Sequence, residues 1–194
     1  MGIDTPHIFP RDAIEFPCFA KPYDGSCSKN ASVIRNPTEL SDVILSDEKM
    51  LFMEFIDSSY SEFTVDAYYD RQGILRCLVP RQRIEVRGGE VSKGATRRHF
   101  LYDFLLPKLS TLQGARGCLT LQFFANTTNE RVIALEINPR FGGGFPLSYS
   151  AGANYPGWLI DEYFLQRSIP FFDAWEQNLL MLRYDAKVLL HEVE

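Results

Sequence analysis

Apolar and polar positions alternate along much of this chain, and the pattern predicts mainly antiparallel strands. The clearest example runs from Phe63 to Tyr69, where apolar and polar residues succeed each other as in a half-buried strand. Arg71-Gln72-Gly73 is typical of a tight turn, after which Ile74 to Val79 is expected to pair back as a hairpin. Further strands are expected at residues 14–21, 32–35, 50–56, 84–86, 117–125 and 131–138, with a closing strand pair or one long strand at 179–190.

Helical spacing is confined to three segments. A helix is expected to begin at Asn36-Pro37-Thr38-Glu39 and to continue to about Glu48. Residues 95–112 place large apolar side chains on one side, and Pro107 is expected to kink or break that helix. Residues 155–166 read as an amphipathic helix. Because strands outnumber helices and come as hairpins, the sequence predicts an α+β fold with largely antiparallel sheets.

Composition narrows the class of protein. The 194 residues are 45% hydrophobic and 23% charged, which suits one compact unit or two small lobes. The net charge is -5 and no basic stripe stands out, which argues against nucleic acid as a partner. No stretch approaches ~20 apolar residues, so we expect no membrane span. The four cysteines have neither C-x-x-C nor zinc spacing, and reduced thiols in a cytoplasmic protein are expected.

The segment Leu135 to Gly144, LEINPRFGGG, carries the strongest chemical signal. Glu136 and Asn138 are two residues apart on a strand and therefore project from one face of the sheet. Two oxygen-bearing side chains suit a hard cation such as Mg²⁺, and Arg140 follows where it could meet phosphate oxygens. The alternative is an edge strand with a solvent-facing acid and an Asn-Pro turn.

Two weaker signals would complete such a site. Gln122, in LTLQFF, can lie close to Glu136 if residues 117–125 and 131–138 form a hairpin; otherwise it is an ordinary half-buried glutamine. Lys21 ends an apolar strand just before the loop Tyr23 to Ala31. The charge of Lys21 and the backbone N–H groups of the loop could together hold phosphates. A solvated lysine before a turn is the commoner arrangement.

A fourth signal is the strand LFMEFID, followed by Glu62. A strand that ends in an exposed turn can offer backbone N–H and C=O groups to an adenine edge, and Glu62 could accept from ribose hydroxyls. The alternative is a plain strand and hinge.

Taken in order, FPCFAKPYDGSCS, LFMEFIDSSYSEFTVDAYYD, LTLQFF and LEINPRFGGG resemble the ATP-grasp superfamily, and most closely the large subunit of carbamoyl-phosphate synthase. The resemblance covers about residues 1–168. It implies Lys21, with the loop residues Gly25 and Ser26, on the ATP phosphates, and Glu62 on ribose. Adenine would meet the backbone of the hinge, and a further positive group would come from Arg81 or Arg83. The hinge residues are Met53, Glu54, Phe55 and Ile56.

The resemblance also implies a metal site and a reaction. Gln122, Glu136 and Asn138 would hold one or two Mg²⁺ (or Mn²⁺) ions, and Arg140, with Lys21, would act on the transferring phosphoryl group. The implied reaction is ATP-dependent ligation: a carboxylate or bicarbonate becomes an acyl phosphate, which an amine or ammonia then attacks. Two α+β lobes with ATP between them are expected, with residues 1–13 as a linker, 14–50 as the small mobile lobe and 51–194 as the large lobe.

One departure from the family affects this interpretation. Family members carry an N-terminal substrate lobe and a helix with an additional cationic side chain before a segment like GIDTP, which is residues 2–6 here. We therefore expect one phosphate-binding element to be missing, or to come from a separate chain. The alternative function is a non-catalytic nucleotide-binding module or an inactive fragment. A homodimer is left open.

Overall fold

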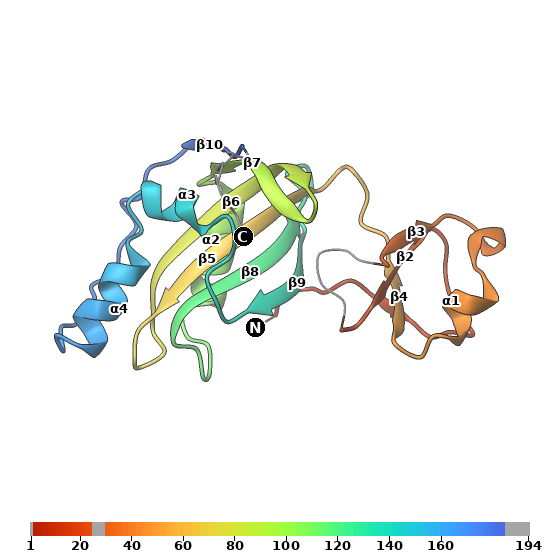
Figure 1. Cartoon of the computed structure of the whole chain (residues 1–194), viewed down its shortest axis with the longest axis horizontal. Coiled ribbons are helices and arrows are strands. Elements are labelled where there is room, and N and C mark those ends of the chain that lie inside the picture. Colours follow the sequence, from red (N-terminus) through yellow and green to blue (C-terminus); the bar gives the residue numbers. More distant parts are fainter. Residues whose placement is uncertain (1, 25–29, 185–194) are drawn as a thin grey trace, which may run out of the picture.

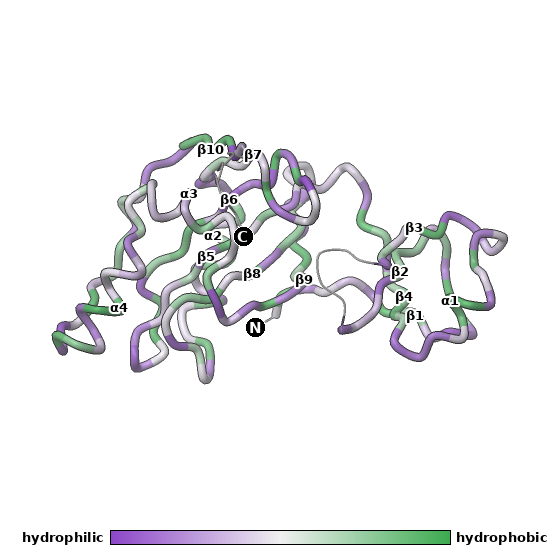
Figure 2. Tube along the Cα trace, in the orientation of Figure 1, coloured by the Kyte–Doolittle hydropathy of each residue, from purple (hydrophilic) through white to green (hydrophobic). Residues whose placement is uncertain are grey.

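The chain forms two antiparallel sheets, one toward each end of an elongated molecule (Figure 1). This computed structural model describes residues 2–24 and 30–184. The smaller sheet has the strand order β1-β4-β2-β3, and the larger has the order β10-β7-β6-β5-β8-β9. Strands of the larger sheet contain both hydrophobic and hydrophilic segments, and the turn between β5 and β6 is hydrophilic (Figure 2).

The smaller sheet packs against two short helical turns. Phe52 and Ile34 are among its buried residues, and Leu40 and Ile44 pack against them. The helix expected up to Glu48 is shorter than predicted, because it divides into a 3-10 turn and a single short α-helix. The elements are β1 (Ile8–Phe9), β2 (Cys18–Pro22), β3 (Ser32–Ile34), η1 (Pro37–Glu39), α1 (Asp42–Ser46) and β4 (Met50–Glu54).

Strands of the smaller sheet come from both sides of the predicted small lobe. β1 lies inside residues 1–13 and pairs with β4, which begins at Met50. The first segment therefore contains a strand of this sheet. How residues 1–13, 14–50 and 51–194 divide into folding units stays a prediction.

The larger sheet carries three helices and the main hydrophobic core. Its hairpin of β8 and β9 lies at one edge, and the short β10 pairs with β7 at the other. The elements are β5 (Ser61–Tyr69), β6 (Leu75–Arg87), β7 (Glu90–Thr96), α2 (Phe100–Lys108), β8 (Gly117–Ala125), β9 (Val132–Asn138), α3 (Phe145–Ser150), α4 (Tyr155–Tyr163) and β10 (Leu180–Leu182).

The expected hairpin is confirmed, because β6 pairs back on β5 from Leu75 onward. Two sequence-based expectations for this sheet are, however, wrong. Residues 75–79 and 84–86 are parts of the single strand β6 and not two strands, and its pairing with β7 shifts register between Arg83 and Val86. The helix predicted at 95–112 is only α2, because the residues before it pair with β6 as β7. His99 caps α2 by accepting from the N–H of Leu101 (3.0 Å), and the helix ends one residue after Pro107. Of the strand pair or long strand expected at 179–190, residues 180–182 form β10, and residues 185–190 lie outside the described ranges, so that part stays a prediction.

β5 is buried on both faces rather than half-buried as its alternation suggested. Phe63 contacts the ring of His99 beside α2, so one face is covered by that helix. On the other face Tyr68 meets Tyr155 of α4, and Ser148 of α3 binds Asp66. Beyond α3 and α4, Glu62 and Thr64 on this second face line a cavity that residues of the smaller sheet also line.

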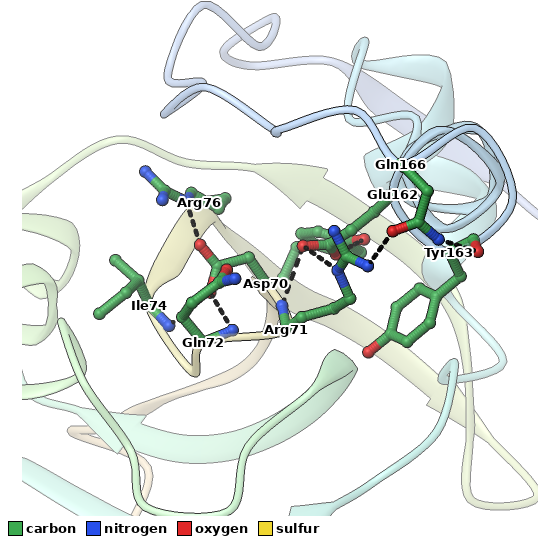
Figure 3. Close-up of polar contacts among 9 residues, drawn as sticks. Asp70, Arg71, Gln72, Ile74, Arg76, Glu162, Tyr163 and Gln166 are labelled. Carbon is green, nitrogen blue, oxygen red and sulfur yellow. Dashed lines mark hydrogen bonds and ion pairs between the residues drawn. The ribbon is translucent and has the colours of Figure 1, made fainter.

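A polar cluster attaches α4 to the turn between β5 and β6 (Figure 3). Glu162 is 2% exposed and accepts from the Tyr68 hydroxyl and the Arg71 N–H, both at 2.9 Å. Within the turn, burial opposes ionisation of Asp70, but hydrogen bonds from the Ile74 N–H and the Arg76 guanidinium outweigh it and lower the pKa of that carboxyl. These contacts replace water around both buried carboxylates and fix where α4 sits.

Two further expectations concern thiols and membranes. Cys18, Cys77 and Cys118 are free and buried, and Cys27 lies outside the described residues. None of the helices in the described part of the chain is both long and apolar enough to cross a membrane.

Candidate functional site

A cavity of about 500 Å³ lies between the two sheets and gathers the candidate residues from both. The smaller sheet contributes Lys21 and the hinge that follows β4, and the larger sheet contributes β5, β6, β8, β9 and the glycine-rich loop. Gly25 and Ser26 lie outside the described residues. The candidate residues that line the cavity are Lys21, Met53, Glu54, Phe55, Ile56, Glu62, Arg83, Gln122, Glu136, Asn138 and Arg140.

The expected hairpin of β8 and β9 is confirmed, and it places the candidate metal ligands side by side. Gln122 is the direct cross-strand partner of Glu136, and Thr120 is the partner of Asn138. The Asn138 side-chain amide donates to Glu136 Oε1 at 2.9 Å. Paired residues of an antiparallel ladder point to the same face, so all three candidate ligands face the cavity.

A bulge in β9 makes this arrangement compatible with a buried core. The register shifts between Gln122 and Phe123, so that Leu135 is an extra residue on β9. Val132 is consequently buried in the core of the larger sheet, whereas Glu136, four residues later, is exposed at the cavity. Strict alternation would have put both on one face, so the bulge was not foreseen from the sequence.

The donor set fits a Mg²⁺ ion held jointly with phosphate. Gln122, Glu136 and Asn138 offer amide and carboxylate oxygens, the ligand type that Mg²⁺ prefers. Within residues 2–24 and 30–184, no group of three or more His, Cys, Asp or Glu side chains could hold a metal. A cation here would thus have one carboxylate and need further oxygens from a ligand. The role of the three residues as metal ligands stays a prediction.

Glu62 and Arg83 form an ion pair inside the cavity. Arg83 Nε lies 2.9 Å from Glu62 Oε1, and Arg83 Nη2 donates to the Gly89 carbonyl at 3.1 Å. Burial raises the pKa of Glu62, while the positive charge of Arg83 opposes that shift. Glu62 is therefore a partly desolvated carboxylate whose partner is already in place.

Arg81 has a different position from Arg83, although both line the cavity. Arg81 is 2% exposed, and its Nε and Nη2 donate to the two carboxylate oxygens of Asp66 at 2.7 and 3.1 Å. Asp66 also accepts from the Ser148 hydroxyl at 2.6 Å. Sequence analysis did not identify Asp66, Thr120 or Ser148 as parts of the site, because an aspartate at a polar position of an alternating strand is expected to face solvent.

The three glycines of the loop allow it to pack closely on this network. A Cβ at Gly142 would lie 2.9 Å from Thr120 Cγ2, and one at Gly144 would collide with Arg81 Nη1. At Gly143 it would collide with the carboxylate of Glu90. The loop is glycine-rich because side chains of the larger sheet occupy the space where side chains of the loop would be.

Comparison with known proteins identifies the family. Residues 46–181 match the family model described as "ATP-grasp in the biosynthetic pathway with Ter operon". No curated protein matches the chain.

Solved structures share the fold at low sequence identity. A biotin carboxylase–β-γ-ATP complex from Campylobacter jejuni aligns with a TM-score of 0.70 and 14% identity over 92% of this chain and 46% of that one. N5-carboxyaminoimidazole synthetase from Staphylococcus aureus, complexed with ADP, gives 0.63 and 14% over 77% and 44%. L-Amino acid ligase from Bacillus licheniformis gives 0.57 and 18% over 76% and 39%.

The chain spans less than half the length of each of these three structures. The predicted α+β ATP-grasp fold is confirmed, and the family match covers well over half of the chain. The chain therefore belongs to the ATP-grasp family that is described from the biosynthetic pathway with the Ter operon.

Proposed function

We propose that the chain binds ATP, together with Mg²⁺ or Mn²⁺, in the cavity between the two sheets. The observation that carries this proposal is the composition of that cavity. It combines the cations Lys21 and Arg140 with the carboxylate of Glu62 and the oxygen donors of the β8–β9 hairpin. Positive groups for phosphate, an acceptor for ribose and ligands for a hard cation thus line one space.

The proposed pose follows from where these groups lie. Adenine would contact the hinge, residues 53–56, and the ribose hydroxyls would donate to Glu62. The phosphates would extend toward Lys21 and Arg140, with the metal ligands beneath them. Because Arg83 pairs with Glu62 in the structure, a ribose at Glu62 would share that carboxylate with Arg83. Arg83 would then supply the positive charge nearest the ribose.

The proposed reaction class is ATP-dependent ligation. A carboxylate oxygen attacks the γ-phosphorus of ATP, and an acyl phosphate forms. The bond between the γ-phosphorus and the β–γ bridging oxygen breaks, and ADP leaves with that oxygen. The nitrogen of an amine or ammonia then attacks the acyl carbon, loses a proton and displaces inorganic phosphate. A bound Mg²⁺ would supply charge neutralisation on the phosphate oxygens. Lys21 and Arg140 would stabilise the negative charge that develops during transfer, and Arg140 would contact the γ-phosphate.

Within this class, we propose chemistry like that of the carbamoyl-phosphate synthase large subunit, with bicarbonate and ammonia as one substrate pair. The support is the motif itself: Gln122 at the first metal position and LEINPRFGGG on the next strand. We also propose that a separate chain supplies further substrate contacts, and that the protein works in the cytoplasm. Buried free thiols are consistent with that reducing compartment.

Calorimetric titration with Mg·ATP tests the proposal. We expect binding in the micromolar to millimolar range, weakened in Lys21→Met and Arg140→Ala. Lys108→Met is the matched control, because Lys108 lies on α2 beside Phe104 and not in the cavity. A folded sample that binds no Mg·ATP at millimolar ligand would refute the proposal, and binding without turnover would favour a non-catalytic module.

A further inference from the structure

Thr120 is a buried side chain that the proposed chemistry does not use, yet it holds the backbone of Arg140. Thr120 is 3% exposed, and its hydroxyl lies 2.8 Å from the Arg140 carbonyl oxygen and 3.3 Å from Asp66 Oδ1. A hydroxyl has a single proton to donate, and both neighbours are acceptors. The shorter contact marks the Arg140 carbonyl as its main acceptor, with Asp66 as the weaker second one.

The same aspartate holds the other end of the segment that starts at Arg140. Ser148, on α3, donates to Asp66 Oδ2 at 2.6 Å, and Tyr155, on α4, donates to the Asp66 backbone carbonyl at 2.9 Å. Asp66 itself is fully buried and held by two hydrogen bonds from Arg81. Residues 140–148 are therefore held at both ends by one buried cluster: Ser148 donates to Asp66, and Thr120, which lies beside Asp66, donates to the Arg140 carbonyl.

Close packing removes the remaining freedom of the backbone between these two ends. Gly142 lies against Thr120, where a Cβ would be 2.9 Å from Thr120 Cγ2. Gly144 lies against Arg81 so closely that a Cβ would collide with the guanidinium. Two of the three loop glycines thus pack against Thr120 and Arg81, which contact the Arg140 carbonyl and Asp66.

Among the described residues, the Arg140 side chain has a local contact to the neighbouring residue. It is exposed at the cavity, and its Nη1 donates to the carbonyl of Phe141 at 3.3 Å. A long cationic side chain on a free loop would lose much conformational entropy on meeting a phosphate. Fixing the backbone at its base reduces that loss and sets the direction in which the guanidinium points.

We infer that Thr120, supported by Asp66, is the positioning residue of Arg140 and sets how strongly the site prefers ATP over ADP. This inference rests on the proposed function, in which Arg140 contacts the γ-phosphate that ADP lacks. Loss of the Thr120 hydroxyl therefore weakens ATP binding and leaves ADP binding almost unchanged. A purely structural role would weaken both nucleotides equally.

The test measures dissociation constants for Mg·ATP and Mg·ADP in Thr120→Val, Thr120→Ser, Arg140→Ala and the Thr120→Val/Arg140→Ala double variant. Thr120→Val keeps the shape of the side chain and removes the hydrogen bond. We expect it to lower the ATP-over-ADP preference by about three- to tenfold, the value of one such hydrogen bond. Thr120→Ser keeps a hydroxyl and is expected to retain most of the preference. In the Arg140→Ala background, Thr120→Val is expected to change nothing further.

The outcomes separate this inference from the proposed function. Suppose that the wild type binds ATP and that Arg140→Ala lowers the ATP-over-ADP preference. If Thr120→Val then weakens ATP and ADP binding equally, or lowers the preference further in the Arg140→Ala background, the inference is wrong and the proposed function stands. If the wild type binds no nucleotide, both fail. Should Thr120→Val not fold, Ser148→Ala takes its place, and an unchanged ATP-over-ADP preference there overturns the two-ended attachment.

Discussion

Removing the guanidinium of Arg81 is expected to destabilise the larger sheet more than any comparable change in the cavity. Asp66 is fully buried, and Arg81, which is 2% exposed, supplies two of its hydrogen bonds. In Arg81→Met the apolar stem is kept, but the carboxylate stays in a site that water does not reach. The hydroxyls of Ser148 and Thr120 remain near it, and neither carries a positive charge.

The expected loss is about 3–5 kcal/mol, the usual cost of leaving one partner of a buried ion pair uncompensated. For a chain of this size, each kcal/mol lowers Tm by about 2–4 °C, so we expect a drop of about 10 °C. Tryptophan fluorescence is a suitable probe, since both tryptophans, Trp158 and Trp175, pack in the core of the larger sheet.

Arg83→Met is the matched control, two residues along the same strand. Its partner, Glu62, has a side chain that is 28% exposed and can regain water, so we expect a clearly smaller loss. Adding Asp66→Asn to Arg81→Met removes the unpaired charge and is expected to recover part of the stability. Equal losses in the two arginine variants, or no recovery in the double variant, would refute the reasoning.

Three other changes have expected outcomes. Burial lowers the pKa of His99, which caps α2 through an unprotonated nitrogen. The contribution of His99 to stability is therefore full above its unfolded-state pKa of about 6.5 and is lost as the pH falls below that value. His99→Asn should reduce the difference in Tm between pH 7 and pH 5 in thermal melts. Gly144→Ala should lower Tm more than Gly143→Ala, because Arg81 cannot move away from a new Cβ whereas the exposed glutamate beside Gly143 can; equal shifts would contradict this. Glu136→Ala should abolish the Mg²⁺ dependence of ATP binding with Tm unchanged, and unfolding without any change in metal dependence would place it in the core.

Local sequence predicted the strands near the site well. β8 has the bounds expected from the sequence, residues 117–125, and β9 differs by one residue. Both strands have a continuous run of strand-forming residues between clear turn signals, so their pairing depends on neighbours in the chain. The direct pairing of Gln122 with Glu136 follows from that hairpin.

Predictions from local sequence were wrong where distant parts of the chain determine the secondary structure or the burial of a segment. β7 contains Ser92, Lys93 and Gly94, which have weak strand preference, and it forms because its backbone pairs with β6 and β10. β5 shows the opposite effect: its polar positions Thr64 and Asp66 signalled a solvent face, but α3 and α4 cover part of it. The helix at α4 was expected from the sequence, but nothing local indicated which face of the sheet it would cover, and α3 was not expected at all.

The candidate site was predictable to the extent that its residues are adjacent in sequence or in a hairpin. Glu136, Asn138 and Arg140 lie within five residues, and Gln122 faces them across one turn. The network around Asp66 joins β5, β6, β8 and α3, and no sequence spacing marks such a set. Groups that could touch a ligand were thus visible in the sequence, whereas the groups that hold them in place were not.

This difference has a physical basis in the two halves of the cavity. Lys21 and the hinge belong to a small sheet with a core of few residues, whereas Arg140 and the candidate metal ligands stand on a wide, densely packed sheet. An ion pair also joins the halves: Arg131, beside β9, holds Glu54 at the end of β4 at 3.0 Å. A ligand between the sheets would therefore contact the densely packed larger sheet on one side and the smaller sheet, which few contacts join to it, on the other. In such a cleft, the position of Arg140, the proposed phosphate ligand, depends on the buried hydrogen bonds around Asp66 and Thr120, although neither residue would take part in the chemistry.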